Sequence, residues 1–175
     1  MAVRNATDLF LTELGDMYSA ERQITKILPQ LAGESADAEV KSAFEMHLRQ
    51  TQQHIQNLDQ CFSLLGTQPP NVDCEAVKGL KKEHETFKKE NPPEDILTMF
   101  DLGAALKTEH YEIASYTGLI GMARLMGQTQ VVNLLEQNLN QEKEMAQKAE
   151  QLSRQLGQRL AGPPPQSRAG QQPTA

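Results

Sequence analysis

The chain has 175 residues, of which 38% are hydrophobic and 5% aromatic, and its formal net charge is −6. This length fits one domain with a proper core. Leu, Ala, Glu, Gln and Lys are plentiful, tryptophan is absent and β-branched runs are scarce, which favours an all-α protein. The acidic balance disfavours general nucleic-acid binding.

The N-terminal segment shows no signal-peptide pattern, and no apolar run approaches the ~20 residues that span a bilayer. We therefore expect a cytoplasmic protein without a membrane anchor. The two cysteines, Cys61 and Cys74, form neither a disulfide framework nor a zinc-binding spacing. Cys61 falls on the apolar face of a predicted helix, whereas Cys74 falls in a connector, where exposure is expected.

Two long helices are predicted in the first part of the chain. Residues 6–32 carry apolar side chains at steps of three and four, which is one face of a helix. Asn5 or Thr7 can cap its start. Gly33 ends it, and a second periodic segment follows at 37–65. The short link between the two helices predicts an antiparallel hairpin.

The second part of the chain predicts a short helix, a second hairpin and a tail. Residues 74–90 form the short helix, which lies in the crossover, and their interleaved Lys and Glu favour a solvated face over an RNA patch. Two long helices follow at 94–125 and 129–160. The sequence therefore predicts a four-helix bundle over residues 1–160. The Pro, Gly and Gln-rich segment 161–175 is predicted to be disordered.

Five polar side chains interrupt the apolar faces of the four long helices. They are Glu21, His54, Glu109, Glu112 and Glu142. Charged side chains are rarely fully buried unless they are paired or bind a metal. Counting outward from each hairpin turn brings Glu21 near His54, and Glu142 opposite Glu109 and Glu112. Carboxylates and imidazole converging from four helices are typical of di-iron and di-manganese centres, so we predict an Fe or Mn site with room for one or two ions.

A second interpretation stays open for these residues. The carboxylates could form a buried ion-pair network with Arg22, Lys107 or Lys143, or turn to solvent, and His54 could be a core histidine held by a carboxylate. His47 is interpreted as a structural residue. Without a metal, four buried carboxylates would repel one another and some would take up protons.

Four segments of the chain resemble the YciE/YciF family of bacterial ferritin-like stress proteins. They are DLFLTELGDMYSAERQITKILPQL near the N-terminus, HLRQTQQHIQNLD in the second helix, TEHYEIASYT at 108–117 and LLEQNLNQEKE in the last helix. The resemblance covers residues 5–157. It implies a ferritin-like four-helix bundle with a crossover helix between the two hairpins, a homodimer and a stress-linked role.

The resemblance also implies a ligand pattern. The wider rubrerythrin and ferritin-like group carries Glu on the first helix, Glu-x-x-His on the second, Glu-x-x-Glu on the third and Glu-x-x-His on the fourth. The five polar residues fit this pattern, but Thr51 stands where the second helix should carry its glutamate, and Met145 where the fourth should carry its histidine. His47 or Gln50 are candidate replacements. These departures bear on oxygen or peroxide chemistry more than on metal binding.

Two classes of function follow. The first is a metal-dependent oxidoreductase, peroxidase-like, catalase-like or ferroxidase, which acts on peroxide or Fe(II) during stress. The second is a non-catalytic dimeric scaffold with a degenerate metal site, which Thr51 and Met145 favour. The chain has no nucleophile triad, phosphate loop or dinucleotide motif, which disfavours hydrolase and nucleotide-dependent activities.

Overall fold

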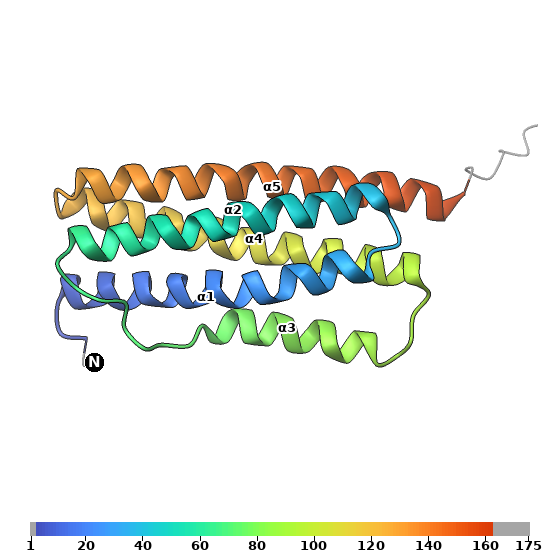
Figure 1. The fold of residues 1–175 in the computed structure, drawn as a ribbon, viewed down its shortest axis with the longest axis horizontal. Coiled ribbons are helices and arrows are strands. Elements are labelled where there is room, and N and C mark those ends of the chain that lie inside the picture. Colours follow the sequence, from blue (N-terminus) through green and yellow to red (C-terminus); the bar gives the residue numbers. More distant parts are fainter. Residues whose placement is uncertain (1–2, 163–175) are drawn as a thin grey trace, which may run out of the picture.

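The computed structural model describes residues 3–162, which form five helices and no strand (Figure 1). The helices are α1 (Ala6–Glu34), α2 (Ala38–Leu64), α3 (Glu75–Lys88), α4 (Glu94–Leu125) and α5 (Thr129–Ala161). The all-α prediction is confirmed, and each predicted helix boundary agrees within about two residues. Of the tail predicted for 161–175, Ala161 ends α5, and residues 163–175 lie outside the described part of the chain.

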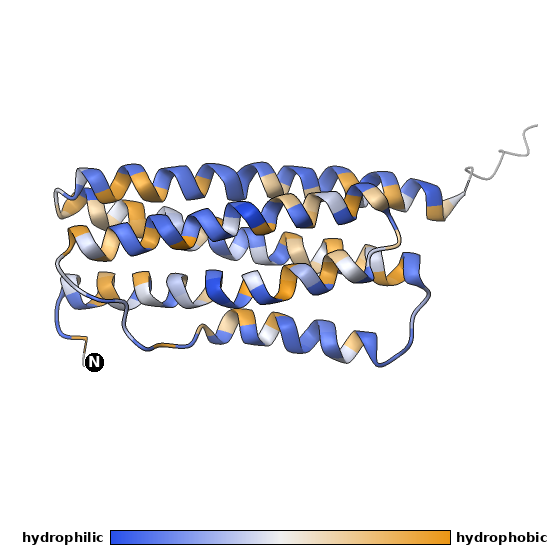
Figure 2. Ribbon diagram, viewed as in Figure 1, coloured by the Kyte–Doolittle hydropathy of each residue, from blue (hydrophilic) through white to orange (hydrophobic). Residues whose placement is uncertain are grey.

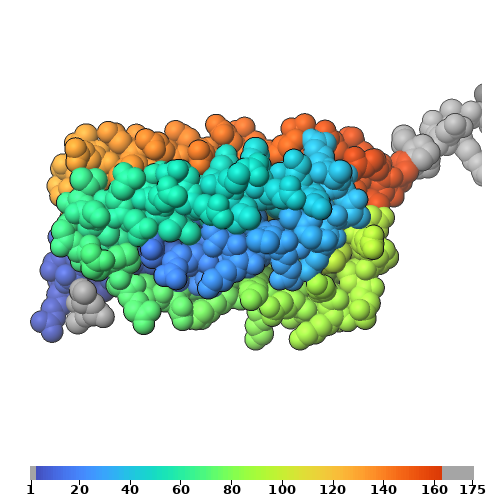
Figure 3. Space-filling view, viewed as in Figure 1, coloured from blue at the N-terminus to red at the C-terminus, as the bar shows by residue number. Residues whose placement is uncertain are grey.

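The four long helices form a four-sided bundle. α1 and α2 make one antiparallel hairpin and α4 and α5 the other, while α2 also packs against α5 and α1 against α4 (Figure 1). α3 lies outside this bundle along α1 and α4. It returns the chain to the end at which α4 begins, so α2 and α4 run parallel. In the space-filling view, α5, α2, α1 and α3 follow one another across one face (Figure 3).

Local signals explain where the first two helices start and stop. The Asn5 side chain accepts a hydrogen bond from the Asp8 backbone N–H at 2.9 Å, which confirms one of the two predicted caps of α1. The Asp37 carboxylate caps α2 in the same way. Gly66 has φ +68°, a left-handed conformation that suits glycine, and it follows the end of α2. Polar side chains therefore cap the starts of α1 and α2, and a glycine turn follows the end of α2.

The bundle core is apolar toward both ends and polar near the middle. α1 carries Phe10 and Leu14 near its start, Leu28 and Leu31 near its end, and Glu21 between them, all of them buried. Figure 2 shows the same pattern, with a hydrophilic stretch of α1 between apolar ones. The apolar layers supply the hydrophobic stabilisation that holds the helices together on either side of the polar middle.

Both cysteines are buried and free. This agrees with the expectation for Cys61, but the expected exposure of Cys74 is wrong. Cys74 precedes the first residue of α3, and its thiol lies 3.1 Å from the hydroxyl of Tyr111 on α4. Packing of the crossover segment against α4 therefore buries a position that looked like a loop in sequence. None of the helices in residues 3–162 combines the length and the apolarity that crossing a membrane requires.

A close approach at Gly15 should make this glycine necessary. A Cβ at this position would overlap the Pro70 ring in the segment between α2 and α3. We expect Gly15→Ala to lower the free energy of unfolding by about 1–3 kcal/mol, because the loop must move away from α1. Gly103→Ala in α4 is the matched control, since a Cβ there meets nothing within 4 Å in the described structure.

Urea unfolding of both variants provides the measurement. Gly103→Ala should be neutral or stabilising by up to about 1 kcal/mol, since alanine favours the helix. Equal midpoints for the two variants would show that Pro70 is not held against α1.

Candidate metal centre

Six ionisable side chains meet in the middle of the bundle, from all four long helices. They are Glu21 from α1, His47 and His54 from α2, Glu109 and Glu112 from α4, and Glu142 from α5. None is more than 2% exposed. The structure thus brings together the five residues singled out in the sequence and adds His47. Their role as metal ligands stays a prediction.

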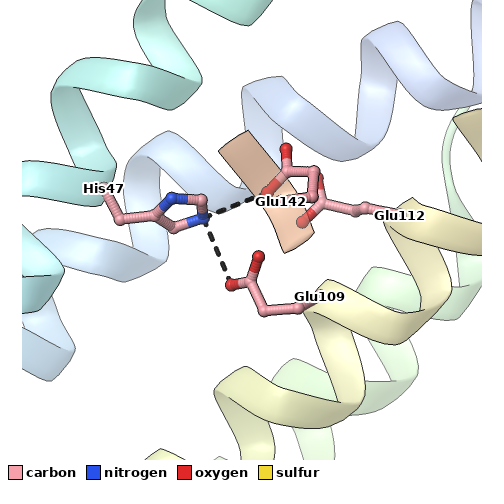
Figure 4. Close-up of side chains that lie close together, drawn as sticks. All are labelled: His47, Glu109, Glu112 and Glu142. Atoms are coloured by element: carbon pink, nitrogen blue, oxygen red, sulfur yellow. Dashed lines mark ion pairs between the residues drawn. The ribbon is translucent and has the colours of Figure 1, made fainter. Parts of the chain in front are cut away.

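Glu142 connects two groups of potential ligands. Its Oε1 atom lies 2.8 Å from His54 Nδ1, and its Oε2 atom lies 3.6 Å from His47 Nε2. Glu21 Oε1 lies 3.3 Å from His54 Nδ1, and Glu109 Oε1 lies 3.2 Å from His47 Nε2. Figure 4 shows His47 directed at Glu109 and Glu142, with Glu112 beside them.

The two groups have the dimensions of adjacent ion sites. One contains His47, Glu109, Glu112 and Glu142, and the other contains Glu21, His54 and Glu142; in each group the potential ligand atoms lie within 4.8 Å of one another. Since the two oxygens of Glu142 face different histidines, this carboxylate is placed to serve both groups. The arrangement can accommodate two cations that share one carboxylate.

Two glutamines orient the histidines. His54 Nε2 lies 2.7 Å from Gln141 Oε1, and His47 Nδ1 lies 3.3 Å from Gln50 Oε1. An amide oxygen only accepts, so the ring nitrogen that faces it carries the hydrogen. In the neutral ring, the other nitrogen then directs its lone pair toward the carboxylates. Metal-binding histidines need this orientation. Gln50, a candidate replacement ligand in the sequence, is instead placed to orient His47.

Helical spacing explains how these side chains share one interior surface. His47 and His54 are two turns apart on α2, and Glu109 and Glu112 are one turn apart on α4. Thr51 lies between the two histidines, and its hydroxyl donates to the His47 carbonyl oxygen at 2.9 Å. Because Thr51 stands where a glutamate is expected, α2 adds no carboxylate to the cluster at this position.

Many polar atoms of the cluster lack a hydrogen-bond partner within residues 3–162. They are Glu21 Oε2, Glu109 Oε2, both carboxylate oxygens of Glu112 and Glu142, His47 Nε2 and His54 Nδ1. The short histidine–carboxylate distances are ion-pair contacts whose directions do not suit hydrogen bonds. Unsatisfied buried polar atoms are costly. Oxygen and imidazole donors are suitable ligands for Fe and Mn, so the residues present fit such ions.

The basic partners considered in the sequence do not enter the cluster. Arg22, Lys107 and Lys143 are all exposed. Lys107 pairs instead with Glu83 on α3 at 2.9 Å. Among the described residues, the ion-pair interpretation is therefore left with two histidines as the basic partners of four carboxylates.

Burial dominates the electrostatics of the cluster. It raises the pKa of Glu112 well above its usual value, and repulsion from Glu142 and Glu21 adds to the effect. Burial also raises the pKa of Glu142 to about 7 and that of Glu109 to about 8. For His54, burial disfavours the charged ring, but the negative charges of Glu21 and Glu142 beside it outweigh this effect and raise the pKa. Without a cation, the cluster therefore retains protons at neutral pH.

A series of hydrogen-bonded side chains holds Glu21 in place. The Tyr116 hydroxyl donates to Glu21 Oε1, and Asn138 donates to the Tyr116 hydroxyl oxygen at 2.9 Å. Asn57 in turn donates to Asn138 Oδ1 at 2.7 Å. These asparagines were not among the residues predicted from the sequence. The available signal was that Asn138 lies one turn before Glu142 on the same face of α5.

Glu109 also borders a small cavity between α1, α3 and α4. The cavity measures about 40 Å³, and its walls are mostly apolar. Its lining includes Ile24 and Leu28 of α1, Val77 of α3 and Ala105 of α4. A space of this size holds water-sized molecules. A small neutral molecule in the cavity would thus meet the cluster at Glu109.

Comparisons with known proteins identify the family of the chain. The family described as "Domain of unknown function (DUF892)" matches residues 5–161. Protein YciF of Escherichia coli (strain K12) is 33% identical over 144 residues, which cover 82% of this chain and 87% of that protein. These matches confirm the predicted resemblance to the YciE/YciF family.

Solved structures support the fold. The E. coli stress protein YciF superposes with a TM-score of 0.82 at 30% identity, covering 89% of this chain and 98% of that one. YcfI from Rhodopseudomonas palustris has a TM-score of 0.82 at 37% identity, covering 85% and 94%. Symerythrin from Cyanophora paradoxa, at 16% identity, has a TM-score of 0.61 over 90% and 88% and supports the fold alone. The predicted ferritin-like bundle is confirmed.

The raised carboxylate pKa values predict how the metal-free protein depends on pH. Between about pH 5 and pH 8, folded Glu109 and Glu142 bind more protons than they do in the unfolded chain, where glutamate titrates near ~4.3. The free energy of unfolding should therefore fall by a few kcal/mol as the pH rises through this window. Urea unfolding with a chelator present measures it, and Glu112→Gln/Glu142→Gln should show a smaller slope. A stability that rises with pH would contradict the prediction.

The contact between Gln141 and His54 predicts an effect on metal affinity. Gln141→Leu removes the acceptor for the outer N–H of His54, and such losses typically cost about 10–100-fold in affinity. Competition with a chromophoric chelator for Mn²⁺ measures the change. Gln137→Leu, at an exposed position one turn earlier on α5, should bind Mn²⁺ as the wild type does. Equal affinity in both variants would remove Gln141 from the site.

Proposed function

The chain belongs to the DUF892 family, and we propose that it is a stress protein that binds two iron or manganese ions in its core and detoxifies peroxide or Fe(II). The observation that carries this proposal is the position of Glu142, whose two oxygens face His54 and His47 separately. A carboxylate shared between two imidazoles in this way suits two neighbouring cations.

The proposed ligands divide between the two ions. Glu21 and His54 would hold one ion, and His47, Glu109 and Glu112 the other, while Glu142 would serve both. The four carboxylates carry the charge needed to balance two divalent cations. Hard oxygen donors combined with imidazole suit Fe and Mn.

A bound pair of redox-active ions would supply electrons to peroxide or accept them from Fe(II). The protein's own residues prepare the site. Gln50 and Gln141 hold the outer N–H groups of the histidines, and Tyr116 holds Glu21. The apolar layers on either side exclude bulk water.

The alternative is a non-catalytic dimeric scaffold. Two observations favour it. The Thr51 hydroxyl is committed to the backbone of its own helix, and Met145 is buried in the apolar core. Thr51 thus supplies no carboxylate where a glutamate is expected, and Met145 supplies no imidazole where a histidine is expected. The homodimer and the cytoplasmic location remain predictions.

Metal analysis of a matched pair of variants tests the proposal. Wild-type protein loaded with Fe(II) or Mn²⁺ should hold about two ions per chain more than Glu142→Gln, because that substitution removes the carboxylate shared by both groups. Glu144→Gln, at an exposed position two residues along α5, should lose none. Elemental analysis after desalting gives the numbers.

Activity assays then separate the two candidate functions. The loaded wild type and Glu144→Gln should consume peroxide or oxidise Fe(II), and Glu142→Gln should do neither. Two Glu142-dependent ions without turnover of either substrate would favour the scaffold. Equal metal content in wild type and Glu142→Gln would reject the metal centre.

A further inference from the structure

A second buried cluster lies where the crossover helix meets the bundle. It consists of Glu34 at the end of α1, His84 on α3 and Asp101 on α4. His84 Nε2 lies 3.2 Å from Glu34 Oε2 and 3.1 Å from Asp101 Oδ1. Asp101 is fully buried and His84 is 4% exposed. The cluster shares no residue with the six-residue centre in the middle of the bundle.

Several buried oxygen and nitrogen atoms of this cluster have no hydrogen-bond partner in the described part of the protein. Within residues 3–162, neither oxygen of Asp101 has a hydrogen-bond partner, and the same holds for Glu34 Oε2 and His84 Nε2. One N–H on Nε2 would have to serve two carboxylates. Lys88 binds Glu34 through the other oxygen, Oε1, and so leaves Oε2 free for the cluster. A buried carboxylate is thus directed at His84 with too few donors around it.

The distances and donor types fit a metal cation. Ligands held 2.0–2.2 Å from a divalent metal are about 2.8–3.6 Å apart for angles between octahedral and tetrahedral values, and both measured separations lie in this range. Two carboxylates also match the charge of one divalent ion. Imidazole with carboxylate oxygens suits first-row transition metals such as Zn²⁺, Mn²⁺ or Fe²⁺ more than Ca²⁺ or Mg²⁺.

We propose that Glu34, His84 and Asp101 form a second, mononuclear site for a divalent transition-metal ion. Each ligand comes from a different helix, so the ion fastens α3 to both α1 and α4. This link matters for α3 because it lies on the outside of the bundle and packs mainly against these two helices (Figure 1).

The second site also reaches the small cavity beside the core cluster. His84 lines this cavity at one place and Glu109 at another, and Val77 and Leu80 of α3 contribute to its wall. An ion that fixes His84 therefore fixes the α3 side of the space next to Glu109. The second site would hold the wall in place without touching the residues of the core cluster.

Zinc binding tests the proposal in a background without the core cluster. The full chain carrying Glu112→Gln and Glu142→Gln loses two carboxylates of that cluster. With Zn²⁺ as the sole metal, it should retain one ion per chain after desalting. At ~100-fold excess over Kd, Zn²⁺ should raise Tm by roughly 5–10 °C, reversibly with a chelator. Hydrogen exchange should slow over residues 75–88.

Adding Asp101→Asn to this background should abolish the bound zinc, the rise in Tm and the slowed exchange. Glu34→Gln provides a second removal at a more exposed position, should the asparagine variant lose its helical circular dichroism. His110→Ala removes an exposed histidine of α4 and is the control that should change none of the three readouts.

Absence of bound zinc in the Glu112→Gln/Glu142→Gln protein would overturn the proposal, as would zinc that persists in both folded ligand variants. His84 would then be a buried histidine that contacts two carboxyl groups without a metal ion. This outcome is independent of the proposed function, which rests on the ions that depend on Glu142 in the otherwise wild-type chain.

Discussion

Burial of four carboxylates in the middle of one helical bundle is the constraint on which the rest of the structure depends. Glu21, Glu109, Glu112 and Glu142 are at most 2% exposed, and in the described part of the chain two histidines are the basic groups in contact with them. Such a cluster destabilises the fold unless protons or metal ions neutralise it. The apolar layers toward both ends of the bundle must therefore hold the four helices together against this cost.

The order of the helices assembles the cluster from two halves. The first hairpin brings Glu21 next to His54, and the second brings Glu109 and Glu112 next to Glu142. Contacts across the hairpins, from His54 to Glu142 and from His47 to Glu109, then join the halves. Because α2 packs on α5 and α1 on α4, the same packing that closes the apolar core also closes the polar centre. The crossover helix makes this order possible.

The parts of this arrangement that were predictable from sequence are those with a periodic signal. Charged residues on apolar helical faces identified Glu21, Glu109, Glu112 and Glu142, and turn positions placed them at a common level. His47 was named both as a structural residue and as a candidate replacement, and the choice stayed open because hairpin counting locates partners only to within a turn or two. The contacts of Gln50 and Gln141 depend on side-chain rotamers, which periodicity does not specify. His84 was hidden in a helix whose other charges are solvated, and its partners are distant in sequence.

Thr51 and Met145 change the expected ligand set, but the carboxylates that remain still match the charge of two divalent ions. In the pattern that the resemblance implies, these positions hold a glutamate and a histidine. His47, one turn before Thr51, points its Nε2 atom at Glu109 and Glu142 and so restores the number of imidazoles. The carboxylate is not replaced, since the Thr51 hydroxyl binds the His47 carbonyl. Four carboxylates remain, which is the charge that two divalent ions require. The departures therefore alter which helix supplies the imidazole, and they leave a donor set that is neutral with two divalent ions bound.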